Sequence, residues 1–317
     1  MIRALALAIF LVFPPSPGAG ENLVRIVVGF PPGAALDALA RLLAQELRRD
    51  LDRPVLVHNR AGADGRMAAE LVKAAQPDGA TFLLTPVAPM AIYPHSFAGS
   101  LRYDPFRDFS PVAHLAAVQQ GLGIAAIMPA HSLADYIALV RKNPRAGYYA
   151  SPAVGSIPHF LGAMLARAAG IEMTHVPYKG NATVLQALAT AEVGAALTST
   201  ADIATLVKSG KARLLATAGP RRAAAFPEVP TFKEAGYEIE GGGWYALFAP
   251  AGTAQAAIDR VAISATAAVR GAPLRQRLEG MGLEPTGLGP LELAAILKAD
   301  YDKWGPVIRA SGFKPAE

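Results

Sequence analysis

Two segments of the chain place an apolar run, a Pro/Gly turn and a helix start in direct succession. The first begins as Val27-Val28-Gly29-Phe30-Pro31-Pro32-Gly33 and continues to residue 43, and the second spans residues 148–159. The first backbone N–H groups of a helix have no partner within it and carry a partial positive charge. A carboxylate or phosphate can therefore be held at such an end by the backbone alone. Two such loops facing each other would form a clamp for an anion.

The side chains of these two loops are the candidate ligand contacts. Asp37 falls in the first turn of the first helix, where it either offsets the helix dipole or accepts a hydrogen bond from a ligand or water. Ser156 is the expected N-cap of the second helix, and its hydroxyl and N–H suit a carboxylate. His159, in the first turn of that helix, either reaches the ligand or caps the turn. The candidate ligand-binding residues are Phe30, Gly33, Ala34 and Asp37 in the first loop, Ser151, Val154, Gly155, Ser156 and His159 in the second, and Thr85 and Thr198 at strand ends.

Motifs for catalysis, metal binding or a cofactor are missing from the sequence. No serine occupies G-x-S-x-G, no P-loop pattern occurs, and none of the six histidines forms H-x-H or H-E-x-x-H. The absence of cysteine excludes disulfides, thiolate catalysis and cysteine-ligated zinc. We therefore expect no catalytic residues, no metal and no cofactor. The alternative left open is an α/β enzyme that acts on a carboxylated substrate, with His159 and Asp37 as acid and base.

Strand and helix patterns alternate along most of the chain and predict an α/β fold. Residues 86–111 have several prolines and aromatic residues and are expected to be irregular. The expected strands are 25–30, 54–58, 81–85, 122–128, 147–151, 173–176, 193–198, 212–218 and 244–248. The expected helices are 36–50, 66–75, 132–140, 156–169, 182–191, 201–209 and, in a C-terminal part that is otherwise helical, 254–270, 273–281 and 290–310.

The two series of strands and helices predict two lobes. After a signal peptide at 1–20, the first lobe is expected to comprise residues 21–121 and 238–317, and the second lobe residues 122–237. Two extended passages, at about 119–127 and 238–250, would connect the lobes as a two-stranded hinge. Hinged two-lobe proteins bind their ligands in the cleft between the lobes.

The N-terminus has the pattern of a secretory signal peptide. Arg3 supplies a positive charge, residues 4–13 are continuously apolar, and residues 14–20 are small or helix-breaking. Cleavage is expected just before Glu21, with a retained anchor as the alternative. The chain of 317 residues is 52% apolar and has a formal net charge of +5. Its basic residues are scattered without interleaved aromatic residues, so we expect no nucleic-acid binding but a modest attraction for anions.

Several short motifs follow one another along the chain in a specific order: Ile26-Val27-Val28-Gly29-Phe30-Pro31-Pro32-Gly33 with Asp37, His58-Asn59-Arg60-Ala61-Gly62, Pro77-Asp78-Gly79, Ala150-Ser151-Pro152 with Gly155, Ser156 and His159, His175-Val176-Pro177-Tyr178-Lys179-Gly180, and Trp244 with Phe248-Ala249-Pro250. Through these motifs the sequence resembles the Bug-type periplasmic receptors of tripartite tricarboxylate transporters over nearly its whole length after the leader. The resemblance implies a two-lobe periplasmic-binding-protein fold of type II, a Venus flytrap with two hinge strands. It also implies a periplasmic receptor without catalytic activity.

The resemblance further implies a ligand and partners. The ligand would be a small organic carboxylate (a mono-, di- or tricarboxylate or an acidic amino acid) held by backbone amides and bridging waters. The receptor, expected to be a monomer, would serve membrane transporter subunits, and a degenerate receptor that feeds a membrane sensor is the alternative. Ala34 and Leu36 stand where the family usually has glycine and a small hydroxyl residue, and Thr198 where it often has aspartate. These departures predict a tighter and less acidic cleft.

Overall fold

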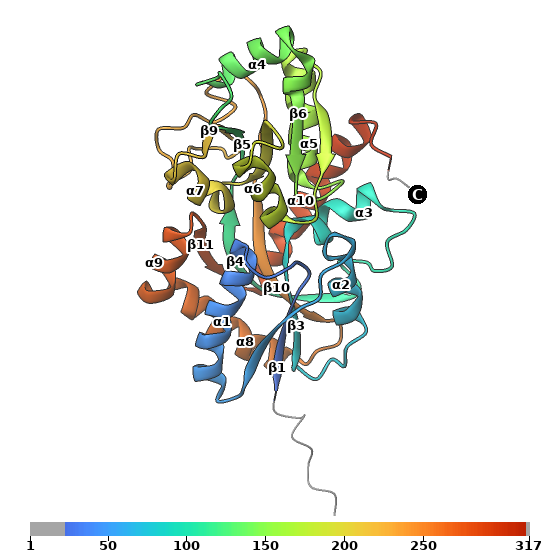
Figure 1. Ribbon diagram of the computed structural model, residues 1–317. Coiled ribbons are helices and arrows are strands. Elements are labelled where there is room, and N and C mark those ends of the chain that lie inside the picture. The colour runs from blue at the N-terminus through green and yellow to red at the C-terminus, as the bar shows by residue number, and fades with distance from the viewer. Residues whose placement is uncertain (1–22, 315–317) are drawn as a thin grey trace, which may run out of the picture.

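The computed structural model describes residues 23–314, which form two lobes, each built on its own β-sheet (Figure 1). The α/β fold predicted from the sequence is confirmed. The predicted signal peptide at 1–20 lies outside the described residues. Within those residues, no helix is both long enough and apolar enough to cross a membrane.

The first lobe contains a six-stranded sheet in the order β11-β4-β10-β3-β1-β2. Strands β1, β2 and β3 run parallel, and β10 lies antiparallel between β3 and β4. Its strands are β1 (Val24–Val28), β2 (Val55–Asn59), β3 (Thr81–Pro86), β4 (Phe109–Val118), β10 (Gly243–Pro250) and β11 (Glu284–Leu288). Its helices are α1 (Ala35–Leu51), α2 (Arg66–Lys73), α3 (Tyr93–Ser96), α8 (Gln255–Arg270), α9 (Ala272–Gly280) and α10 (Pro290–Ala310), with the short helices η1 (Ala63–Gly65) and η2 (Ala88–Ile92).

The second lobe contains a five-stranded sheet in the order β7-β6-β8-β5-β9. Its strands are β5 (Gln120–Ala125), β6 (Tyr148–Ser151), β7 (Thr174–Pro177), β8 (Ala195–Ser199) and β9 (Ala212–Thr217). Its helices are α4 (Leu133–Lys142), α5 (Ile157–Ala169), α6 (Asn181–Ala189) and α7 (Thr200–Lys208), with the short helix η3 (Pro144–Gly147). In both sheets the three parallel strands lie in the order second, first, third. Helices α1 and α5 each follow the first parallel strand of their lobe, at the carboxyl end where α/β sheets bind ligands.

Burial explains why the segment before the first loop forms a strand and the segment after it a helix. Strand β1 is made of β-branched residues apart from Arg25, and its apolar side chains are fully buried, as expected for a parallel strand covered on both faces. Leu39, Leu43 and Leu47 of α1 repeat every four residues and are also fully buried. Each contributes roughly 1.5–3 kcal/mol relative to an exposed side chain. The loop between β1 and α1 is therefore held at both ends by core packing.

The chain passes twice between the lobes. Strand β4 ends at Val118 and β5 begins at Gln120, and the return runs from the end of β9 to Gly243 at the start of β10. The predicted boundary between residues 121 and 122 falls inside β5, and the one between 237 and 238 falls inside the second connection. These lobe limits stay a prediction. Helix α10 packs on β4 and η2, and its Trp304 ring lies 6.5 Å from that of Phe160 in α5 of the second lobe.

Two expectations for secondary structure were wrong. The region expected to be irregular contains η2, α3 and the beginning of β4, a ten-residue strand. The register between β4 and β10 shifts at two places, so the side chains of β4 do not keep the alternation that reveals a strand. The C-terminal part, expected to be helical after 254, also contains β11. This strand holds Pro285 and Gly287 and lies at the edge of its sheet, where such residues are tolerated.

Candidate ligand-binding site

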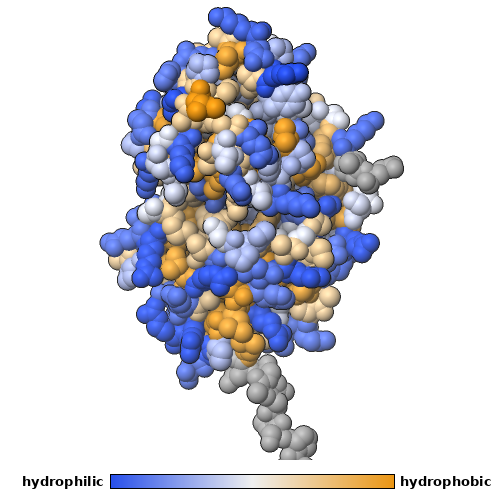
Figure 2. Space-filling model, viewed as in Figure 1, coloured by the Kyte–Doolittle hydropathy of each residue, from blue (hydrophilic) through white to orange (hydrophobic). Residues whose placement is uncertain are grey.

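A cavity of about 100 Å³ lies between the two lobes. Its volume is below the roughly 300–1,000 Å³ of pockets that hold drug-sized molecules, so it fits a small ligand. Much of its wall is apolar: Phe30, Leu36, Val87 and Tyr245 come from the first lobe, and Ile157 from the second. In the space-filling view, pale and tan residues border the boundary between the lobes, and blue hydrophilic side chains are scattered over both outer surfaces (Figure 2).

Four helices begin at this cavity. The N-cap residues of α1, α5, α6 and α7 are Ala34, Ser156, Gly180 and Ser199, and all four line the cavity wall. The N-terminal end of a helix carries a partial positive charge because its first N–H groups are unpaired. The exposed Lys179 adds a full positive charge at the same wall. The cavity is therefore surrounded by groups that attract an anion.

A buried carboxylate of the second lobe neutralises part of this charge. Asp202 Oδ1 accepts a 2.9 Å hydrogen bond from the backbone N–H of Ala35, the first residue of α1 in the other lobe. Its Oδ2 accepts hydrogen bonds from Ser199 Oγ at 2.6 Å and from Asn181 Nδ2 at 2.5 Å. Burial raises the pKa of Asp202, although these hydrogen bonds act in the opposite direction. Asp202 was not among the predicted site residues, and its one signal in the sequence is its position three residues after the N-cap Ser199.

Asp37 is held inside the first lobe. Its carboxylate accepts hydrogen bonds from Arg41 Nε at 3.0 Å, Asn59 Nδ2 at 2.9 Å and Gly33 N at 3.2 Å. Burial would raise the pKa of Asp37, but these donors together hold it below its usual value. Both carboxylate oxygens are thus engaged within one lobe, at the end of the first loop. Its predicted contact with a ligand stays a prediction.

The second loop is fixed by hydrogen bonds of its own side chains and by a contact with His175 of β7. Ser156 occupies the N-cap position of α5 as predicted, but its hydroxyl donates to the carbonyl oxygen of Ala153 at 2.7 Å. Gly155 N donates to His159 Nδ1 at 3.0 Å, so this histidine stabilises the turn. The Nε2 atom of His175 lies 2.6 Å from Ser151 Oγ.

The enzyme alternative pairs Asp37 with His159, and the two residues have different partners. The carboxylate of Asp37 is bound by Arg41 and Asn59, whereas the ring of His159 stacks on that of His175. Burial lowers the pKa of His159 to about 4, so its imidazole is neutral at pH 7. The hydrogen bonds of Asp37 and His159 go to other residues, so the two side chains are not arranged as an acid–base pair.

The remaining predicted site residues fall into three groups. Phe30 and Ala34 line the cavity, as Ser156 does. Leu36, one of the departures from the family pattern, also lines it.

The hydroxyl groups of the two predicted threonines have protein partners: Thr85 Oγ1 donates to the carbonyl oxygen of Pro86, and Thr198 Oγ1 to Asn181 Oδ1. Gly33, with φ of +106°, is exposed, whereas Val154 is half-buried and Gly155 is buried. The ligand-binding roles of all eleven residues stay predictions.

Two polar groups of the cavity wall were not predicted. Tyr93 Oη and Gln120 Oε1 are buried and have no hydrogen-bond partner among the described residues. Tyr93 follows η2, in the region that the sequence pattern left irregular, which is why it was missed.

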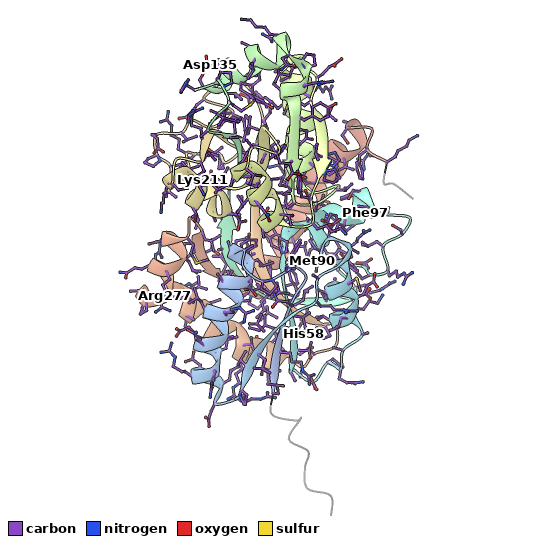
Figure 3. All side chains as sticks on the ribbon, in the orientation of Figure 1. His58, Met90, Phe97, Asp135, Lys211 and Arg277 are labelled. Atoms are coloured by element: carbon purple, nitrogen blue, oxygen red, sulfur yellow. The ribbon has the colours of Figure 1, made fainter. Side chains whose placement is uncertain are left out.

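In residues 23–314, no group of three or more His, Asp or Glu side chains gathers as metal ligands. Figure 3 labels Phe97 near the boundary between the lobes, and His58 and Asp135 well away from it.

Comparisons with known proteins agree with this geometry. The family model described as "Tripartite tricarboxylate transporter family receptor" matches residues 39–313. Protein BugT of Bordetella pertussis is 30% identical over 92% of this chain and 90% of its own length. A solved structure of an R. palustris protein with adipate is 30% identical, covers 94% of this chain and 100% of its own, and has a TM-score of 0.89. MatC from Rhodopseudomonas palustris with bound malate is 28% identical, with 90% and 98% coverage and a TM-score of 0.84.

Proposed function

Because the chain belongs to the tripartite tricarboxylate transporter receptor family, we propose that it captures a small organic carboxylate between its two lobes. The observation that carries this proposal is the convergence of four helix N-termini and Lys179 on one small cavity. Relatives whose structures contain adipate and malate support the same class of ligand.

Binding is proposed to stabilise the closed arrangement of the lobes. A ligand in this cavity contacts groups of both lobes at once, including Phe30 of the first and Ser156 of the second. The closed state gains these contacts and an open state does not, so the ligand shifts the population toward closure. We further propose that residues 1–20 direct export to the periplasm, and that the closed, monomeric receptor delivers its ligand to membrane transporter subunits.

A thermal-shift screen of mono-, di- and tricarboxylates and acidic amino acids tests the proposal. A ligand at 100 times its dissociation constant adds about 2.7 kcal/mol to the free energy of unfolding, which is readily detected as a higher melting temperature. We expect at least one carboxylate to give such a shift. A clear shift with a neutral sugar or a cation, together with none from any carboxylate, would contradict the proposal.

A further inference from the structure

One carboxylate of the protein lies directly behind the cavity wall, where Asp202 accepts hydrogen bonds from Ser199 and Asn181, two residues that line the cavity. We propose that Asp202 occupies the position of one ligand carboxylate, so that this receptor takes small monocarboxylates and discriminates against dicarboxylates. This inference rests on the proposed function and specifies its ligand class. It is carried by the contacts of Asp202, by the charges at the four helix ends and by the apolar wall of the first lobe.

The N-terminus of α1 is occupied by Asp202. Its N-cap residue, Ala34, has no side-chain oxygen with which to cap the helix. The first N–H of the helix, that of Ala35, donates instead to Asp202 Oδ1 across the boundary between the lobes. In Figure 1, α6 and α7 lie at the edge of the second lobe that faces this end of α1. An anion from the ligand would therefore have to displace a protein carboxylate from this position.

Asp202 differs from an acidic residue that merely caps its own helix. In α4, Asp135 accepts from the backbone N–H groups of His131 and Ser132, which immediately precede the helix. The Asp202 carboxylate accepts instead from Ala35 of the other lobe, from the Ser199 hydroxyl and from the Asn181 amide. Its contacts therefore extend over α1, α6 and α7, all of which begin at the cavity.

The helix ends that remain for a ligand belong to the second lobe. The first turns of α1 and α7 contain Asp37 and Asp202, whereas those of α5 and α6 contain no acidic residue. Lys179 directly precedes the N-cap of α6 and lines the cavity. One carboxylate is thus favoured at the ends of α5 and α6.

The first lobe offers an apolar surface to the rest of the ligand. Phe30, Leu36 and Val87 line that side of the cavity. A second ligand carboxylate placed there would lose its hydration, and near α1 it would face the charge of Asp202. The carbon skeleton of a monocarboxylate has neither penalty.

Two neutral polar groups indicate that the cavity is built to receive a ligand. Tyr93 is fully buried, Gln120 is 8% exposed, and the Tyr93 hydroxyl and the Gln120 carbonyl oxygen have no partner among the described residues. Leaving such groups unpaired is unfavourable, so they are most simply explained as contacts for a ligand group. Because both are uncharged, they suit a hydroxyl on the ligand and do not replace the charge that a second carboxylate needs.

Calorimetric titration with matched ligands tests the inference on the unmodified protein. Butyrate and succinate, 3-hydroxybutyrate and malate, and hexanoate and adipate each differ by one carboxylate in place of a methyl group. We expect the tightest-binding monocarboxylate to bind at least tenfold more tightly than its dicarboxylate counterpart. Equal or tighter binding of the dicarboxylates would overturn this inference and leave the proposed function intact. No binding of any mono-, di- or tricarboxylate would overturn both.

Variants of Asp202 test the cause of the discrimination. Asp202→Ala vacates the position at Ala35, and Asp202→Asn keeps an acceptor there without the charge. The quantity compared is the ratio of monocarboxylate affinity to dicarboxylate affinity, measured with butyrate and succinate or with hexanoate and adipate. We expect this ratio to be at least tenfold lower in both variants than in the unmodified protein. Asp135→Ala is the matched control, since it removes an acidic residue from a helix start remote from the cavity, and it should leave the ratio unchanged. A ratio unchanged in folded Asp202→Asn would contradict the role of its charge.

Discussion

The imidazole rings of His159 and His175 stack with their centroids 4.0 Å apart and their planes at 16°. His159 belongs to α5 and His175 to β7, so the pair joins the second loop to the strand beside it. Burial lowers the pKa of His159 to about 4, and burial together with the neighbouring His159 lowers the pKa of His175 to about 3, from an ordinary value of 6.5. Both rings are therefore neutral at pH 7 in the folded protein.

This pair predicts a loss of stability in mild acid. A histidine whose pKa is lower in the folded than in the unfolded state contributes stability that is complete above about pH 6.5 and is lost as the pH falls toward 4 and 3. Each histidine can contribute a slope of at most about 1.4 kcal/mol per pH unit. Urea unfolding between pH 7 and pH 4 measures the slope. His159→Gln should reduce it and the exposed His58→Gln should not, and equal slopes in all three proteins would refute this role.

Lys179 is predicted to contribute to affinity through its charge. Replacement by methionine keeps the length of the side chain and removes the cation at the cavity wall. Since Lys179 is exposed, we expect carboxylate affinity to fall by a modest factor, corresponding to about 1 kcal/mol or less, and to become less sensitive to salt. The matched control is Lys211→Met, an exposed lysine after the end of α7. If the two variants bind equally well at low salt, Lys179 has no direct part in binding.

Removal of the Tyr93 hydroxyl is predicted to stabilise the protein when no ligand is bound. The hydroxyl is buried and has no partner among the described residues, so Tyr93→Phe removes an unsatisfied polar group without creating a large cavity. We expect the free energy of unfolding to rise by about 1 kcal/mol in the absence of ligand. Denaturant unfolding measures the change. A decrease of similar size would show that the hydroxyl is hydrogen-bonded in solution.

Asp37 is predicted to act on stability more than on affinity. Asp37→Ala would remove the acceptor of the Gly33 N–H and one of the two acceptors of the Asn59 amide, at a cost of about 1–3 kcal/mol. The carboxylate does not form part of the cavity wall, so the dissociation constant of a bound carboxylate should change less than threefold, which corresponds to about 0.6 kcal/mol. Asp302→Ala, which removes an exposed ion pair with Lys298, is the control for stability. Loss of binding in a folded Asp37→Ala protein would instead support the prediction that Asp37 contacts the ligand.

The sequence allowed the prediction of features that depend on local pattern. The strand–loop–helix segments at Gly33 and Gly155 and the N-cap position of Ser156 follow from apolar spacing and turn residues, and all were predicted. Strand β4 was missed because its bulges against β10 remove the alternation of its side chains. Its location follows from its pairing partners and cannot be deduced from its own residues.

The candidate site was predicted where it depends on the backbone and missed where it depends on contacts between the lobes. Asp202 and Ala35 are 167 positions apart in the chain, and only the packing of the two lobes brings them together. Similarly, the unpaired state of Tyr93 can be recognised only once all of its neighbours are known. A less acidic cleft was expected because Thr198 stands where the family often has aspartate. That expectation left out Asp202, which follows Thr198 by four residues.

A crystal structure with the tightest-binding carboxylate bound tests the central claim most directly. We predict that the ligand carboxylate lies at the N-termini of α5 and α6, within hydrogen-bonding distance of backbone N–H groups near Ser156 or Gly180. Asp202 should remain bonded to Ala35, and the carbon skeleton of the ligand should lie against Phe30 and Leu36. A ligand carboxylate bound to the Ala35 N–H, with Asp202 displaced, would contradict the account.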